Sequence, residues 1–169
     1  VPEQYRDYNL CLEAVKSNGW SLEYTPEEYR SYDLCLEAVK EYGWALEFIS
    51  KKYKDYNLCL EAVKQNGYSL NYVPEEHKDY NMCLKAVKNN GHALQDVPEK
   101  YRDYNICLES VKQNGYIASC IPNKYKDKLQ GKIKKYIEKI EVQLPKEKYQ
   151  QVFSEIRSYF PEKELSLRM

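Results

Sequence analysis

Apolar and polar positions repeat along this chain with a period of 24 residues. One copy of the pattern, residues 55–67, reads DYNLCLEAVKQNG, and related copies lie before and after it without an insertion or deletion between them. The five copies begin at Asp7, Ser31, Asp55, Asp79 and Asp103 and end at Gly19, Gly43, Gly67, Gly91 and Gly115. A fixed period of this kind indicates a repeat array, in which each unit covers the apolar face of its neighbour.

Each copy predicts a helix of about three turns. Its first residue, Asp or Ser, is a good N-cap, because the side chain accepts a hydrogen bond from the first helical turn. The Gly twelve residues later can adopt the left-handed conformation that ends a helix, so residues 8–18 and their equivalents are predicted to be helical. The apolar residues of this helix cover more than half of its circumference: Leu10, Cys11, Leu12, Ala14 and Val15. So short a helix with so wide an apolar face needs neighbours on two sides, and the copies are therefore predicted to stack.

The segment that links two copies predicts a second, short helix. It begins with an aromatic residue or His, continues with Ser or Ala and then Leu, and is followed in most copies by Pro26, Pro74 or Pro98. Proline suits the first position of a helical turn and sets the residue before it in an extended conformation. The third copy has Ser50 at this place, which weakens the stop but keeps the spacing. The predicted unit is a long helix followed by a broken, shorter one.

The predicted fold is therefore an all-α protein, an α-solenoid of five 24-residue helical repeats capped by C-terminal helices. The repeats occupy residues 1–24, 25–48, 49–72, 73–96 and 97–120. Residues 121–160 are predicted to form a degenerate repeat and the capping helices, and residues 161–169 a frayed tail.

The degenerate region contains a Lys-rich helix, predicted from Lys124 to about Leu144. Its apolar residues fall three or four positions apart and make one stripe: Leu129, Ile133, Ile137, Ile140 and Leu144. This stripe is expected to cover the last repeat. Pro145 begins a further predicted helix, which Pro161 ends.

Charge and hydropathy exclude several classes of protein. Lys plus Arg equals Asp plus Glu over the whole chain, with 26 of each, so the net charge does not indicate a nucleic-acid partner. Residues 1–120 are mildly acidic and residues 121–169 mildly basic. No apolar run is long enough for a membrane span, and the N-terminus lacks the pattern of a Sec signal peptide. Because the chain starts at Val1 within a repeat, we expect it to be a piece of a longer protein.

The cysteines predict packing rather than chemistry. Five of the six lie at one repeat position on the long helix: Cys11, Cys35, Cys59, Cys83 and Cys107. Packed helices are about 8–10 Å apart, whereas a disulfide needs Cα atoms within about 7 Å, and no pair has the spacing of a zinc site. We expect buried thiols in a reducing compartment, with no metal and no cofactor. Cys120 lies outside this register and is a candidate exposed thiol.

No catalytic residue is predicted. A Cys–His pair would need His77 or His92, and these replace aromatic residues at their repeat positions. The carboxylates of Glu13, Glu37 and Glu61 recur beside lysines, as expected of a solvated helix face rather than of a general acid or base.

Tyrosine is the most informative residue type, with 18 Tyr against 3 Phe. Tyrosine fits edges where a ring packs and its hydroxyl stays in water. Two ladders follow the repeat: Tyr5, Tyr29, Tyr53, Tyr101 and Tyr125, and Tyr8, Tyr32, Tyr56, Tyr80 and Tyr104. They can pack neighbouring repeats together, or they can form a concave stripe with Trp20, Trp44 and Tyr68 that anchors a protein partner. The candidate binding residues are Tyr5, Trp20, Tyr29, Trp44, Tyr53, Tyr68, His77, His92 and Tyr101.

Basic residues recur beside the aromatic ones and predict an aromatic and basic face: Arg6, Arg30, Lys54, Lys78 and Arg102. Such a face can follow a nucleic-acid backbone, but the net negative charge of residues 1–120 argues against that partner. An alternative is a membrane-surface module, in which the Lys-rich helix lies on anionic lipid. Its candidate residues are Lys132, Lys134, Lys135 and Lys139.

Residues 60–76, LEAVKQNGYSLNYVPEE, resemble the tandem repeats of domain-of-unknown-function family 4116, whose recurring phrase is LxAVKxNGxALxYxxEEL. The resemblance covers about residues 1–120. Such repeats occur in proteins of amoeba-associated bacteria and large viruses, including effectors that intracellular bacteria inject into host cells. The resemblance therefore implies part of such a bacterial effector, and it implies no activity. The tail with Glu162, Glu164 and Leu167 is similar to the tails of type IV-secreted effectors.

The expected function is thus a non-enzymatic scaffold that binds a protein, in the bacterial cytoplasm or the host cytosol. A further alternative is an accessory domain of an enzyme whose catalytic domain precedes Val1.

Overall fold

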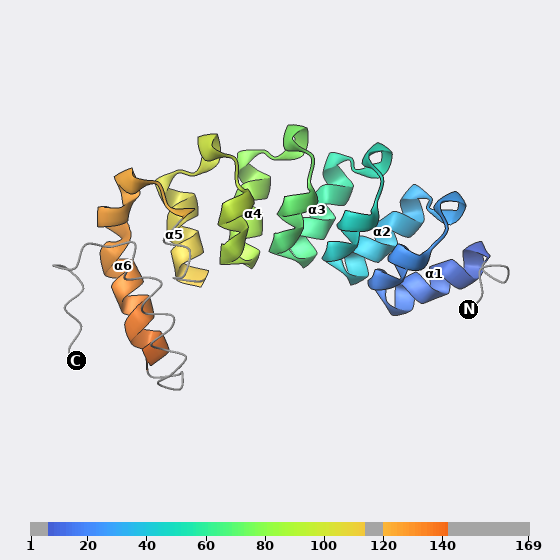
Figure 1. Cartoon of the computed structure of the whole chain (residues 1–169), viewed down its shortest axis with the longest axis horizontal. Helices are drawn as coiled ribbons and strands as arrows, with labels where there is room; N and C mark the ends of the chain where they lie inside the picture. Colours follow the sequence, from blue (N-terminus) through green and yellow to red (C-terminus); the bar gives the residue numbers. More distant parts are fainter. Residues whose placement is uncertain (1–6, 114–119, 142–169) are drawn as a thin grey trace.

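The computed structural model describes residues 7–113 and 120–141. Within these ranges all regular elements are helical, and they follow one another in a single curved row (Figure 1). The prediction of an all-α solenoid with a 24-residue unit is confirmed.

Five long helices recur at the predicted spacing: α1 (Tyr8–Ser17), α2 (Tyr32–Glu41), α3 (Tyr56–Gln65), α4 (Tyr80–Asn89) and α5 (Tyr104–Gln113). The predicted N-caps form. The Asp55 carboxylate accepts a hydrogen bond from the Leu58 amide at 2.8 Å, and the Ser31 hydroxyl accepts one from the Leu34 amide at 3.2 Å. Each cap satisfies an amide that has no partner within the helix, so the first residue of each copy fixes where its helix begins.

Two 3₁₀ helices follow each of the first four long helices. The first has six residues: η2 (Gly19–Tyr24), η4 (Gly43–Phe48), η6 (Gly67–Tyr72) and η8 (Gly91–Asp96). The second is a single turn: η3 (Glu27–Tyr29), η5 (Lys51–Tyr53), η7 (Glu75–His77) and η9 (Glu99–Tyr101). The predicted broken short helix is therefore a pair of 3₁₀ helices, and η5 forms although Ser50 replaces the proline before it.

The glycine after each long helix has a different role from the predicted one. None of the described glycines has a positive φ, so the prediction of a left-handed helix end is wrong. Helix α2 ends at Glu41, the C-cap Tyr42 has an extended backbone, and Gly43 opens the next 3₁₀ helix. A Cβ at Gly43 would lie 2.5 Å from the carbonyl oxygen of Ala62 in the following repeat. Glycine is needed here because two backbones approach closely.

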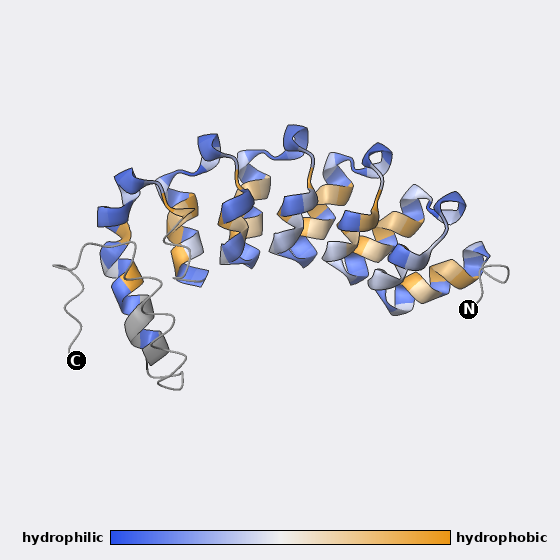
Figure 2. Cartoon of the chain, viewed as in Figure 1, coloured by the Kyte–Doolittle hydropathy of each residue, from blue (hydrophilic) through white to orange (hydrophobic). Residues whose placement is uncertain are grey.

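The repeats pack as two layers. The long helices contact one another in one layer, the six-residue 3₁₀ helices contact one another in the other, and each layer covers the other. Figure 2 shows hydrophobic residues along the middle of the long helices and hydrophilic residues at both edges of the row. In the second repeat the core residues are Leu34, Cys35, Ala38, Val39 and Leu46, all fully buried. Their equivalents in the third and fourth repeats are also fully buried, and the five cysteines of the long helices are buried as predicted.

The row bends into an arch (Figure 1). The single-turn elements η3, η5, η7 and η9 lie along its convex edge, and the long helices run from that edge toward the concave one. Each six-residue 3₁₀ helix therefore starts at the concave edge, where the preceding long helix ends.

The last described helix, α6 (Asn123–Glu141), covers α5 as the predicted cap does. Leu129 and Ile133 are buried, which confirms the first part of the predicted stripe. Leu144, the helix predicted after Pro145 and the tail lie outside the described residues, as do the side chains of Ile137 and Ile140.

Candidate functional site

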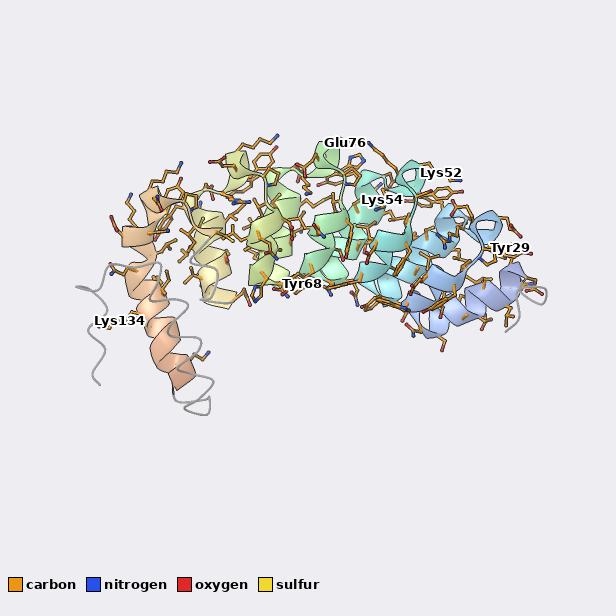
Figure 3. The ribbon with its side chains drawn as sticks, viewed as in Figure 1. Tyr29, Lys52, Lys54, Tyr68, Glu76 and Lys134 are labelled. Carbon is orange, nitrogen blue, oxygen red and sulfur yellow. The ribbon has the colours of Figure 1, made fainter. Side chains whose placement is uncertain are left out.

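The predicted binding residues divide between the two edges of the arch. Trp20, Trp44, Tyr68 and His92 each follow the glycine that opens a six-residue 3₁₀ helix; we call these four residues the concave row. Tyr29, Tyr53, His77 and Tyr101 each end a single-turn element; we call them the convex row. In Figure 3, Tyr68 lies at the concave edge, whereas Lys52 of η5 and Glu76 of η7 lie at the convex edge. The structure thus replaces the expected single stripe by two rows. Tyr5 lies outside the described residues.

The convex row joins neighbouring repeats. The ring of His77 meets that of Tyr56 edge-on at 6.4 Å, and Tyr101 meets Tyr80 in the same way at 6.3 Å. The Tyr56 hydroxyl donates a hydrogen bond to the Asp79 carboxylate at 3.0 Å, and that carboxylate also caps its own helix. Burial and the Asp79 carboxylate raise the pKa of Tyr56 above its ordinary value. This ladder therefore packs the repeats together, which is one of the two roles predicted for it.

The recurring basic residues donate hydrogen bonds to backbone carbonyls instead of forming an exposed basic surface. The Arg30 guanidinium donates hydrogen bonds to the carbonyl oxygens of Thr25 and Phe48 at 2.8 and 2.9 Å. Lys54 reaches the Tyr72 carbonyl at 3.2 Å, and burial lowers the pKa of its ammonium group. These contacts satisfy carbonyls at the ends of 3₁₀ helices, which have no partner inside the helix.

The same kind of contact recurs in the last described repeats. Arg102 bonds the Val97 carbonyl at 2.7 Å, and Lys78 is 8% exposed and pairs with Glu75 at 2.6 Å. Arg6 lies outside the described residues. The Arg and Lys side chains of the predicted aromatic and basic face therefore mostly point into the array, where they bond backbone carbonyls or a neighbouring carboxylate.

The concave row is a chain of ring contacts across the 3₁₀ layer. Trp20 meets Phe48 edge-on at 5.3 Å, Trp44 meets Tyr68 at 5.8 Å, and Tyr68 stacks on His92 at 5.8 Å with an angle of 16° between the rings. Trp20 is exposed and the other three are half-buried. Trp20, Trp44 and Tyr68 therefore each rest on a ring of the next repeat and are partly open to water.

A pocket of about 300 Å³ opens beside this row, between η4, η6 and η8. It is lined by Trp44, Tyr68, Asn71, Tyr72, Gln95 and Asp96. Trp44 meets the Tyr72 ring at 6.4 Å and 61°, so three rings converge on the opening. The Asp96 carboxyl is half-buried, and its burial raises its pKa, although Lys78 and Arg102 oppose the shift.

Sequence reasoning missed the second half of this site. Tyr72 and Asp96 occupy the last position of their 3₁₀ helices, where the earlier repeats have Tyr24 and Phe48. The change from an aromatic residue to Asp at one repeat position was a usable signal. This change can be assigned to a binding site only from the fold, which places that position next to Trp44.

The charge of the surface also differs from the prediction. The four six-residue 3₁₀ helices contain no Lys or Arg, and they carry Glu23, Glu47 and Asp96. The concave row thus lies on an aromatic and acidic face.

The long helices expose a face of internal ion pairs, as predicted. Lys40 pairs with Glu37 at 2.8 Å and Lys64 pairs with Glu61 at 2.6 Å. These carboxylates are neutralised by their own helix, and the arrangement is that of a solvated surface. Among the described residues, no group of three or more His, Cys, Asp or Glu side chains is placed to hold a metal ion.

The lysines of the alternative membrane face lie on the lower half of α6, where Figure 3 shows Lys134. Lys132, Lys135 and Lys139 are exposed and Lys134 is half-buried. In the described part of the chain, no helix has the length and apolar character needed to cross a membrane.

A second pocket, of about 280 Å³, lies between η9 and the start of α6. Cys120 lines it and is half-buried, together with Glu99, Arg102, Ile121, Pro122, Asn123 and Lys126.

Comparison with known proteins gives one family. No curated protein and no solved structure matches the chain. The family described as Domain of unknown function (DUF4116) matches twice in tandem, at residues 31–78 and 79–126. Each match spans two 24-residue units and begins at the N-cap of a long helix. Since the two matches cover more than half of the sequence, this chain belongs to the family described as Domain of unknown function (DUF4116).

Proposed function

We propose that the chain is a repeat scaffold that binds a protein partner through the concave row and its pocket. The observation that carries this proposal is the position of large aromatic rings on the water-facing side of the 3₁₀ layer. That layer already fills the core with Leu22, Leu46, Leu70 and Leu94, which are fully buried. The core of the array therefore does not require large rings at these partly exposed positions.

Aromatic residues in partly open pockets are the usual anchors of protein interfaces. Solenoids use extended concave surfaces for such contacts, because successive repeats present equivalent positions side by side. The concave row combines both features, since Trp20, Trp44, Tyr68 and His92 come from four successive repeats.

We further propose that the array has no catalytic activity of its own. Burial raises the pKa of Cys35 to about 11 and that of Cys59 to about 12, so these thiols stay protonated and unreactive at neutral pH. His77 and His92 are occupied in ring contacts with neighbouring repeats. These features support a binding role.

As for setting, we propose that the protein acts in the cytosol of a host cell as part of a bacterial effector. The resemblance of residues 60–76 and the absence of any need for disulfides in so cysteine-rich an array support this setting. A translocation reporter fused to the protein in its native bacterium tests it: signal in infected host cells is expected, and signal equal to that of a secretion-deficient strain contradicts it.

The binding role is tested with three baits in quantitative affinity capture from host-cell lysate. The baits are the wild type, the double variant Trp44→Ala/Tyr68→Ala, and a convex-edge control, Lys52→Ala/Lys100→Ala. Lys52 and Lys100 are exposed, so the control leaves the core intact. We expect a partner that the wild type and the control retain and that the concave variant loses by at least about tenfold, as hot-spot truncation predicts.

Circular dichroism of each bait checks that the fold is kept. Equal capture by the concave variant, or loss with the convex control alone, would show that the concave row is not the binding surface.

A further inference from the structure

We propose that the pocket lined by Trp44, Tyr68, Tyr72 and Asp96 binds the cationic side chain of a Lys or Arg in a basic segment of the protein partner. This inference rests on the proposed function, because it names the chemistry that the same surface recognises.

The shape of the pocket fits one long side chain. The rings of Trp44, Tyr68 and Tyr72 meet at 5.8 and 6.4 Å and are inclined by 65° and 61°. His92 stacks on one face of Tyr68 at 5.8 Å and 16°, so only the other face of that ring can line the pocket, together with the inclined rings of Trp44 and Tyr72. The cavity of about 300 Å³ is at the lower end of the range for ligand sites, so it suits a single side chain better than a large ligand.

The ring faces favour a positive charge. The π-system of Trp or Tyr carries negative potential on its face and attracts an ammonium or guanidinium group within about 6 Å. The attraction is stronger when the cation loses water on entry. Three rings that line one pocket therefore select a cation over a neutral chain of equal length.

Asp96 adds a formal negative charge to the same wall. Its carboxyl group is half-buried, so it has lost part of its hydration, and an entering cation would compensate for that loss. Lys78 and Arg102 lie near enough to act on Asp96, but their donor groups are held elsewhere. Lys78 pairs with Glu75, and Arg102 donates to the carbonyls of Val97 and Gln95.

No basic residue lines the pocket, and two amides complete it. The carbonyl oxygens of Asn71 and Gln95 can accept hydrogen bonds from a guanidinium or ammonium group. An anionic partner would meet Asp96 with the wrong sign and find no counter-charge in the lining. A neutral, apolar side chain is the alternative occupant, and peptide titration distinguishes the two.

The preceding repeat offers a matched comparison. There Trp20 meets Tyr42 and Phe48, and the position equivalent to Asp96 is Tyr72. Rings occur in both places, but a carboxylate stands at this position only beside Trp44, among the repeats that the structure describes. The charge is thus specific to one junction.

The test uses the full chain with Trp20→Phe, so that Trp44 becomes its single tryptophan, since the sequence has two. Short Gly-Ser peptides, uncharged except for one variable central residue, are added at increasing concentration. The fluorescence of Trp44 measures their binding. The central residue is Lys or Arg in two peptides, their neutral isosteres norleucine or citrulline in two others, and Glu in the last.

We expect saturable binding of the Lys and Arg peptides and affinity for the norleucine, citrulline and Glu peptides that is at least tenfold weaker. Asp96→Asn should weaken binding of the cationic peptides at least fivefold and leave that of the norleucine peptide unchanged. Tyr72→Phe keeps the ring and should change little, whereas Tyr72→Leu should weaken the cationic peptides. Circular dichroism of each variant confirms the fold.

Equal binding of Lys and norleucine peptides, with no effect of Asp96→Asn, would overturn the proposal that the pocket selects a cationic side chain. The concave row would then be an apolar binding surface, and the proposed function would stand. Absence of binding by every peptide would also overturn it. The proposed function itself fails separately, if Trp44→Ala/Tyr68→Ala keeps the captured partner.

Discussion

The cysteine of each long helix is a packing residue, and in helices α2 to α5 burial keeps its thiol protonated. Cys59 and Cys83 are fully buried, and burial raises their pKa values to about 12 and about 11. Lys54 and Lys78 act in the opposite direction but do not cancel the effect of burial. At this scale the repeated Cys behaves as a small hydrophobe.

Thiol reactivity should therefore report opening of the array. The thiolate attacks a sulfur of a disulfide reagent and releases the reagent's other half as a thiolate. A rise in pKa from 9.0 to about 12 lowers the thiolate fraction of Cys59 about a thousandfold at neutral pH. We expect Cys35, Cys59, Cys83 and Cys107 to react at least about a hundredfold more slowly in the native protein than in denaturant. Absorbance of the released reagent measures this, with Cys120→Ser as the control that removes a half-buried thiol. Native rates equal to the unfolded ones would contradict it.

The same thiols predict loss of stability in alkaline solution. Their folded pKa values of about 11 to 12 exceed the ordinary value of 9.0, so the folded state keeps protons that the unfolded state has released. The contribution of these thiols is complete below about pH 9 and falls as the pH rises toward the folded pKa values. Denaturant unfolding at about pH 7 and about pH 10.5 measures it. Cys59→Ala should reduce the difference between the two free energies of unfolding, and an equal or larger difference would contradict this account.

Among the elements, the 3₁₀ helix that begins at a glycine sets the distance between repeats. The Gly43 amide donates to the Gln65 side-chain oxygen at 2.7 Å, and the Gln65 amide group donates back to the Glu41 carbonyl at 3.2 Å. In the next repeat the Asn89 side-chain oxygen accepts from the Gly67 amide at 2.7 Å, and its amide group donates to the Lys64 carbonyl at 2.9 Å. One side-chain amide thus closes the end of the previous helix and ties two repeats together.

Two glycine substitutions should have opposite effects on stability. Gly43→Ala places a Cβ against the Ala62 carbonyl in a packed backbone contact and should cost roughly 1–3 kcal/mol or more. Gly131→Ala lies within α6, where a Cβ meets no atom within 4 Å, and should stabilise by roughly 0.5–1 kcal/mol. The free energy of unfolding in urea measures both. A neutral Gly43→Ala would show that the repeats are not held at the observed separation.

The elements also show how far local sequence signals reach. N-caps, helix lengths and the proline restart depend on neighbours a few residues away, and these predictions were confirmed. The glycine prediction was wrong because Gly after a helix fits both a left-handed end and a close backbone contact. The backbone that decides between them, at Ala62, lies in the following repeat.

For the molecule as a whole, equal spacing makes the repeats interchangeable units. Each one contacts mainly its neighbours, so stability is close to a sum of repeat and interface contributions. The two ends of the described array differ: α6 covers α5, whereas Leu10 of α1 is 39% exposed and its equivalents Leu34 and Leu58 are fully buried.

Deletion of one whole repeat should leave a folded, shorter array. Removal of residues 49–72 joins Phe48 to Val73 in unbroken register, so Gly43 would meet the helix that begins at Tyr80. We expect helical circular dichroism, a lower midpoint and a smaller denaturant dependence, since less surface is buried. Removal of residues 49–60 breaks the register and serves as the control. Loss of cooperative unfolding in the 49–72 deletion would contradict an array of equivalent units.

The sequence by itself determined the class of fold, the period of 24, the order of elements, the N-caps and the buried cysteines. All of these depend on contacts within one unit or on the requirement that identical units cover one another. Only the tertiary structure decided the rest. It placed Trp44 and Tyr68 on one edge and Tyr53 and His77 on the other, turned Arg30 and Lys54 inward, and brought Asp96 beside Trp44. These outcomes depend on the direction in which each helix crosses the arch and on which residues of the next repeat it meets. A one-dimensional pattern contains the spacing of residues but not the side of the molecule to which they point.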